Sequence, residues 1–124
     1  MLGKIILWIS AITFISYGLM CLVSPSVPAG YAGLEIISGD GYAEIGAMYG
    51  GLQIGFGVFC LLGALRSDLY KPGLIALVVV VGPLAIGRLY STLTGIGEVG
   101  TYTYGAMTFE FITAALATVA LRKA

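Results

Sequence analysis

Residues 44–63 read EIGAMYGGLQIGFGVFCLLG, an apolar segment that carries one glutamate, one glutamine and six glycines. Each glycine weakens an isolated water-soluble helix by roughly 0.5 to 1 kcal/mol relative to alanine. In a bilayer, the missing side chain instead lets a second backbone come close. The segment therefore predicts a transmembrane helix whose glycines form packing surfaces for other helices.

The small residues of this helix fall on two opposite stripes. At about 100° per residue, one stripe contains Gly46, Gly50, Gln53 and Gly57, and the other contains Glu44, Met48, Gly51 and Gly55. The pairs Gly46/Gly50 and Gly51/Gly55 match the small-xxx-small spacing of membrane helix interfaces, although a chain with 19 glycines contains some matches by chance. Two smooth stripes predict helix neighbours on both sides. The alternative is that the stripes also line a ligand site.

The whole chain has the composition of an integral membrane protein. Of its 124 residues, 59% are hydrophobic and only 10% are charged, and the mean hydropathy is +1.02. A soluble domain of this size cannot bury so large an apolar fraction. Four apolar runs approach the roughly 20 residues needed to cross a bilayer. They predict a single all-α transmembrane domain over residues 1–124, a four-helix bundle with helices over residues 3–23, 42–65, 72–94 and 101–121.

The sorting of charges predicts the orientation of the bundle. The basic residues that flank helix ends on one side are Lys4, Arg66, Lys71, Arg122 and Lys123. The loops on the other side carry Glu35, Asp40 and Glu98 and no lysine or arginine. By the positive-inside rule, both termini face the cytoplasm. We therefore expect a multi-pass protein of the bacterial inner (plasma) membrane, in contact with membrane lipids.

Two stretches between the predicted helices contain strong turn formers. Residues 24–41 form the longest outer loop, and Tyr31–Ile37 within it is amphipathic enough to lie on the membrane surface as a short helix or turn. Residues 66–71 predict a tight cytoplasmic turn that places Pro72 in the first turn of the third helix. Further along that helix, Pro83 lacks a backbone donor and predicts a kink.

The sequence offers little for catalysis or for cofactor binding. The chain has no histidine, and Cys21 and Cys60 lie near opposite ends of their helices, so we expect neither a metal site nor a disulfide. No serine or cysteine stands beside a base, and no phosphate-binding loop is present. A net charge of zero without a basic patch gives no reason to expect nucleic acid. We therefore expect a protein without a cofactor that is not an enzyme.

Three ionisable residues, Glu44, Arg88 and Glu110, lie inside apolar runs. An unpaired charge costs roughly 2.5 to 3.5 kcal/mol at the centre of a membrane helix. Their depths from the outer helix ends, at about 1.5 Å per residue, place Arg88 between the two glutamates. We therefore expect the arginine to contact both carboxylates. Such a cluster carries one surplus negative charge, which protonation of a glutamate or a bound cation would remove.

The cluster has two interpretations. It is either a structural clasp that joins the last three helices, or a binding site coupled to protons or cations. Tyr49, Tyr90 or Ser91 is a candidate to complete it with a hydroxyl group. Gln53 is a lesser candidate, because a single glutamine can simply form a hydrogen bond between helices.

Together, three segments resemble a family of small bacterial membrane proteins. They are YGGLQIGFGVFCLLGALR at residues 49–66, the arginine within GRLYS at residues 87–91, and the glutamate of the last helix. This combination resembles the domain-of-unknown-function 4345 family over nearly the whole chain. The resemblance implies a compact four-helix membrane fold and implies no activity.

These observations favour one function and leave a second open. The favoured function is helix packing, either as an accessory subunit of a larger membrane assembly or as a homo-oligomer, because the chain has little soluble surface and glycines on two faces of one helix. The alternative is a small transporter, or a protein that binds a lipid or small molecule, that uses the cluster around Arg88.

Overall fold

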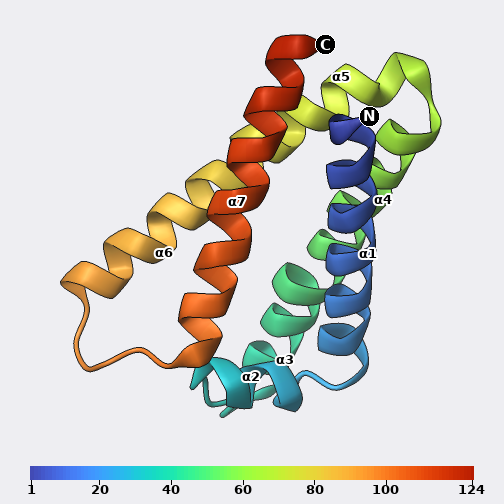
Figure 1. Cartoon of the computed structure of the whole chain (residues 1–124). Helices are drawn as coiled ribbons and strands as arrows, with labels where there is room; N and C mark the ends of the chain where they lie inside the picture. The colour runs from blue at the N-terminus through green and yellow to red at the C-terminus, as the bar shows by residue number, and fades with distance from the viewer.

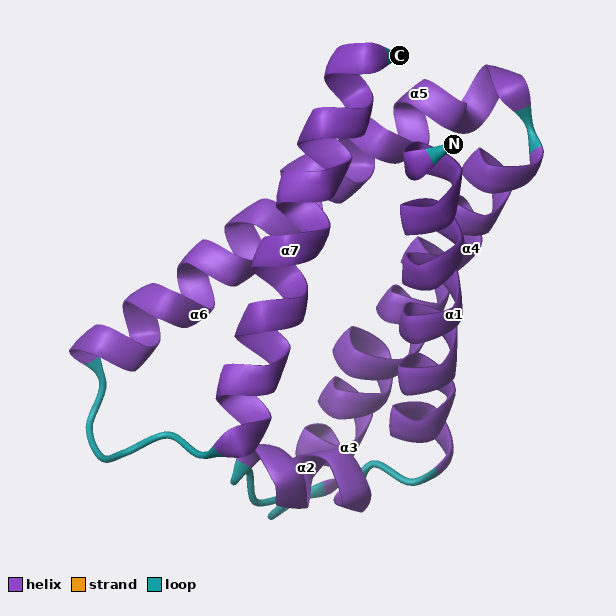
Figure 2. Ribbon diagram, viewed as in Figure 1, coloured by secondary structure: helices purple, strands orange, loops and turns teal.

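The computed structural model describes residues 1–124 and consists of helices and loops without strands (Figures 1 and 2). The elements in chain order are α1 (Leu2–Val23), α2 (Ser26–Ala32), α3 (Gly39–Ile45), the π-helical segment η1 (Gly46–Gly51), α4 (Leu52–Leu65), α5 (Ser67–Ala76), the π-helical segment η2 (Leu77–Val81), α6 (Gly82–Thr94) and α7 (Thr101–Lys123). α3, η1 and α4 form one continuous helical span, and α5, η2 and α6 form another.

Four spans are long and apolar enough to cross a membrane: Leu2–Val23, Gly39–Leu65, Ser67–Thr94 and Thr101–Lys123. Only 22% to 39% of the most apolar part of each span is buried inside the protein. Most of their apolar surface therefore faces outward, as expected for helices in contact with lipid. This arrangement indicates a multi-pass membrane protein.

Figure 1 shows both chain termini at the same end of the bundle, which we call the terminal end. The opposite end, the loop end, carries α2 and the connection over residues 95–100. The two predicted sides of the membrane thus correspond to the two ends of the bundle. The assignment of the terminal end to the cytoplasm stays a prediction from the positive-inside rule.

The closest helix packing joins α1 to η1 and α4, and glycines make it possible. A Cβ atom added at Gly57 would lie 2.9 Å from the backbone nitrogen of Ile15, and one added at Gly18 would lie 2.9 Å from the carbonyl oxygen of Gly50. Gly50 and Gly46 lie against Leu22 in the same interface. The inner glycine stripe therefore allows α1 to approach η1 and α4 at backbone distance.

The turn between α4 and α5 is shorter than the sequence suggested. Arg66 alone has extended backbone angles, and α5 resumes at Ser67, so Pro72 lies inside α5 and not in its first turn. The Arg66 side chain donates two hydrogen bonds to the Asp68 carboxylate, at 3.1 and 2.7 Å, and this acid sits in the first turn of α5, where the helix dipole favours it. Pro72 has no backbone N–H group, so the carbonyl group one turn earlier in α5 lacks its usual donor. Because Pro72 is exposed, this carbonyl group can accept a hydrogen bond from water at the membrane surface.

The surface helix of the outer loop lies earlier than predicted. The sequence favoured residues 31–37, whereas α2 covers Ser26–Ala32 and ends at Gly33, which has a φ of 73°. Pro25 and Pro28 suit the start of a helix, and Gly33 adopts the left-handed conformation that terminates one. Amphipathic spacing alone missed these boundaries. α2 packs against α1 and α7 at the loop end.

The third span changes direction at η2, as the proline suggested. α6 begins at Gly82 directly after η2, and Pro83 is its second residue. α6 packs mainly against η2 and α7. Figure 1 shows α6 leaning away from α1 and α4 toward the loop end. The continuous hydrophobic core accordingly lies toward the terminal end, where Leu7, Leu74, Leu77 and Ala117 are fully buried.

Candidate functional site

A bidentate ion pair joins α6 to α7 inside the membrane-spanning part of the protein. Arg88 donates through Nε to Oε1 of Glu110 and through one terminal nitrogen to Oε2, both at 2.8 Å. The Glu110 side chain is only 6% exposed, whereas that of Arg88 is 27% exposed. Two parallel charge-assisted hydrogen bonds fix the register of the two helices. The pair is electrically neutral.

Arg88 keeps hydrogen-bonding capacity that the protein does not use. A guanidinium group carries five N–H donors, and two of them donate to Glu110, so three have no partner within the protein. The partly exposed arginine lines an open cleft of about 610 Å³. We call it the lateral cleft, and it is lined by Tyr49, Pro83, Leu84, Gly87, Arg88, Ser91, Thr92, Val99 and Thr103.

The lateral cleft exists because two membrane spans separate toward the loop end. Its walls come from η1 on one side and from α6, the connection after α6 and the start of α7 on the other. The second and the third membrane span each contain a π-helical segment. Tyr49 lies inside η1, and Pro83 lies two residues after the end of η2. Such segments widen a helical turn and often adjoin functional sites.

The expected cluster of three charged residues is a cluster of two. Glu44 is exposed and takes part in neither of the two ion pairs of the structure. In an ideal α-helix Glu44 would lie near Arg88, but η1 contains wider turns, and α6 leans away from this span. The surplus negative charge predicted for the cluster is therefore absent from the pair itself.

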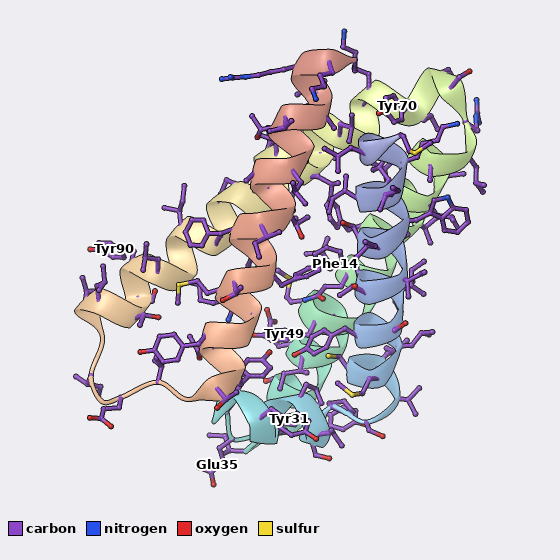
Figure 3. The ribbon with its side chains drawn as sticks, viewed as in Figure 1. Phe14, Tyr31, Glu35, Tyr49, Tyr70 and Tyr90 are labelled. Atoms are coloured by element: carbon purple, nitrogen blue, oxygen red, sulfur yellow. The ribbon has the colours of Figure 1, made fainter.

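The polar residues proposed to complete the cluster lie in three different environments. Tyr49 and Ser91 line the lateral cleft together with Arg88. Tyr90 is exposed and points away from the bundle on the outer side of α6 (Figure 3). Gln53 is half-buried in α4 and forms none of the side-chain hydrogen bonds that link α6 to α7. Only the hydroxyl groups at the cleft can act with Arg88.

The two glycine stripes also have different environments. Gly46, Gly50 and Gly57 face α1, as described above. On the opposite stripe, Gly55 has no atom within 4 Å of an added Cβ, and Gly51 has only the carbonyl oxygen of Gly46, at 3.9 Å. The inner stripe is therefore occupied within the chain, and the outer stripe has no helix against it.

One polar contact in the bundle was missed by sequence reasoning. The hydroxyl groups of Tyr17 and Tyr102 lie 2.6 Å apart and join α1 to α7 near the loop end. A tyrosine on the inner face of an apolar helix needs a partner for its hydroxyl group, and Tyr17 was the signal that could have been used.

Other groups of chemical interest are spread out. Cys21 and Cys60 are free and fully buried. No group of three or more cysteine, aspartate or glutamate side chains is arranged to hold a metal ion. A second open cavity of about 500 Å³ lies at the terminal end beside Lys4, Arg66 and Tyr70, and the guanidinium group of Arg66 is already bound to Asp68.

Comparison with known proteins identifies one family. The model of the family described as "Domain of unknown function (DUF4345)" matches residues 2–121, which is essentially the whole chain. No curated protein and no solved structure matches the chain.

Proposed function

Because the chain belongs to the DUF4345 family, whose description assigns no activity, we propose from its geometry that it acts by binding another transmembrane helix. The surface for this helix is the outer face of η1 and α4 around Gly51 and Gly55. The partner is a subunit of a larger membrane assembly or a second copy of the chain. The proposal assigns no chemical reaction to the protein.

One observation carries the proposal, namely the open space over Gly51 and Gly55. Glycines on the inner stripe of the same span let α1 approach at backbone distance. Lipid tails gain nothing from a missing side chain, whereas a second helix gains close van der Waals contact. The exposed side chains of Leu52 and Val58 flank the outer stripe and would contact the sides of the partner helix.

A coupled transporter is less well supported by the same geometry. That alternative drew on a surplus charge shared by Glu44, Arg88 and Glu110. Arg88 and Glu110 neutralise each other, and Glu44 lies at the surface. The pair therefore has no excess charge that requires a proton or a cation.

Native mass spectrometry of protein extracted gently from its own membrane tests the proposal. We expect the 12.9 kDa chain to travel with a stoichiometric foreign protein or with a second copy of itself. Gly55→Leu should abolish that complex and leave the chain folded, since no atom lies within 4 Å of a Cβ atom added at this position. A monomer alone from the unaltered protein contradicts the proposal.

The matched control is Gly105→Leu in α7, where an added Cβ also has no neighbour within 4 Å. This variant introduces the same side chain on a different helix, and the complex should persist. Loss of the complex in both variants would show that added bulk, and not the outer stripe, disturbs the assembly.

A further inference from the structure

We infer that the lateral cleft binds the acyl-ester group of a membrane glycerolipid, whose carbonyl oxygens accept hydrogen bonds from Arg88. This site goes beyond the proposed helix contact, because it lies at η1, α6 and the start of α7 and does not use Gly51 or Gly55. Three properties of the site point to this ligand: the unused donors, the neutral charge and the depth of the arginine.

The first property is the set of unused hydrogen-bond donors, which need acceptors. Three guanidinium N–H groups of Arg88 lack a partner within the protein, and the arginine lines the lateral cleft. In the low dielectric of a membrane, an unpaired donor on a charged group is costly. Around the arginine, the cleft wall adds hydroxyl groups from Tyr49, Ser91 and Thr103. The site therefore favours a ligand rich in hydrogen-bond acceptors.

The second property is the neutral charge of the ion pair, which limits the charge of the ligand. Glu110 already neutralises Arg88 through two hydrogen bonds, and its side chain is 6% exposed. A carboxylate or phosphate group added here would place a surplus negative charge next to a buried glutamate. A neutral carbonyl oxygen can accept hydrogen bonds from the free N–H groups without adding a negative charge next to Glu110. The chemistry points to an ester and away from an anionic head group.

The third property is the depth of Arg88 in the membrane. The span Ser67–Thr94 has 28 residues and is about 40 Å long, which approaches the thickness of a bilayer with its interfacial regions. Arg88 lies six residues before Thr94, or about 9 Å from the loop end of the span. This depth is close to the edge of the hydrocarbon, where glycerolipid esters join the acyl chains. Pro83 and Leu84 then provide an apolar surface for the acyl chain of the lipid, which continues from the ester toward the bilayer centre.

The direct test compares two lipids that differ only in the carbonyl group. Monoolein, an acyl ester of glycerol, and its ether analogue 1-O-oleylglycerol are titrated onto the purified full-length protein in detergent and counted by native mass spectrometry. Loss of hydrogen bonds to a charged group should weaken the ether by about tenfold or more. Equal binding of the two lipids would overturn the inference, as would tighter binding of oleate, which would mark an anion site.

Two variants connect this binding to the cleft. Gly87→Trp places a large side chain on the cleft wall, where an added Cβ has no neighbour within 4 Å, and should reduce monoolein binding about tenfold or more. Gly82→Trp is the matched control, because Gly82 is equally open and does not line the cleft. Unchanged binding to Gly87→Trp would exclude the cleft. Arg88→Lys keeps a positive charge beside Glu110 and should abolish the preference for the ester.

The lipid that remains bound after gentle extraction identifies the natural source of the ester. A bound phospholipid mass assigns the site to a bulk bilayer lipid, and a glyceride mass without phosphate assigns it to a neutral lipid. Both results support an ester site. A protein side chain cross-linked to photo-leucine at position 84 would show that a partner chain fills the cleft, and would overturn the inference.

Discussion

Arg88 and Glu110 show how a membrane protein accommodates charge within an apolar bundle. Each residue alone would be expensive inside the membrane. Together they form a neutral pair with two hydrogen bonds of 2.8 Å, and the carboxylate is withdrawn from the surface. The interaction is directional, so it constrains how α6 sits on α7, although α6 leans away from α1 and α4. We therefore expect the pair to act as a structural clasp whether or not a lipid also binds.

A double-mutant cycle measures the clasp. Arg88→Leu should lower the free energy of unfolding by about 3 to 5 kcal/mol, because it leaves a buried glutamate without its partner. Arg88→Leu combined with Glu110→Leu removes both charges and should cost less than the single change. The measurement is unfolding of the protein in mixed detergent micelles, followed by circular dichroism. An unchanged free energy of unfolding in Arg88→Leu would contradict the interpretation of the pair as a structural clasp.

Among the elements, the third span does most to determine the form of the site. Its terminal half, with Leu74 and Leu77, belongs to the hydrophobic core, and its other half leans away from η1 and α4. The change occurs where η2 meets Pro83, a residue that cannot donate a backbone hydrogen bond. The lateral cleft and the exposure of Arg88 are consequences of this bend.

Replacement of Pro83 by alanine should therefore move α6. Spin labels at Met48→Cys in η1 and Leu93→Cys in α6, both exposed positions, report the separation across the cleft by double electron–electron resonance. We expect the distance distribution to shift in Pro83→Ala, because the restored N–H allows a regular helix. Pro72→Ala, an exposed proline in α5, is the control and should leave the distribution unchanged. If Pro83→Ala gave the same distance distribution as the control Pro72→Ala, Pro83 would not be the cause of the bend.

At the scale of the whole molecule, the charge distribution and the fold agree on two distinct ends. The termini share one end with Lys4, and the loop end carries the acidic Glu35, which points outward in Figure 3. The positive-inside rule assigns the terminal end to the cytoplasm. This orientation predicts that the lateral cleft opens in the outer half of the membrane.

Labelling of introduced cysteines checks this orientation. Glu35→Cys and Lys123→Cys are both at exposed positions, whereas the native Cys21 and Cys60 are fully buried and give a low background. A maleimide that cannot cross membranes should label position 35 from the outer side of the membrane that holds the protein, and should label position 123 only after that membrane is opened. The reverse pattern would invert the topology, and labelling of both positions from outside would contradict a fold with these sites on opposite sides.

The sequence by itself determined the class of the protein, because hydropathy and helix length depend on composition along the chain. It predicted four apolar spans, the break at Pro83 and the need of Arg88 for an acidic partner. Tertiary structure decided which partner that is, since η1 has wider turns than an ideal α-helix and leaves Glu44 at the surface. It also decided that one glycine stripe is covered by α1 and the other is open. Such contacts depend on how whole helices lean and rotate against one another, and no local sequence pattern specifies that geometry.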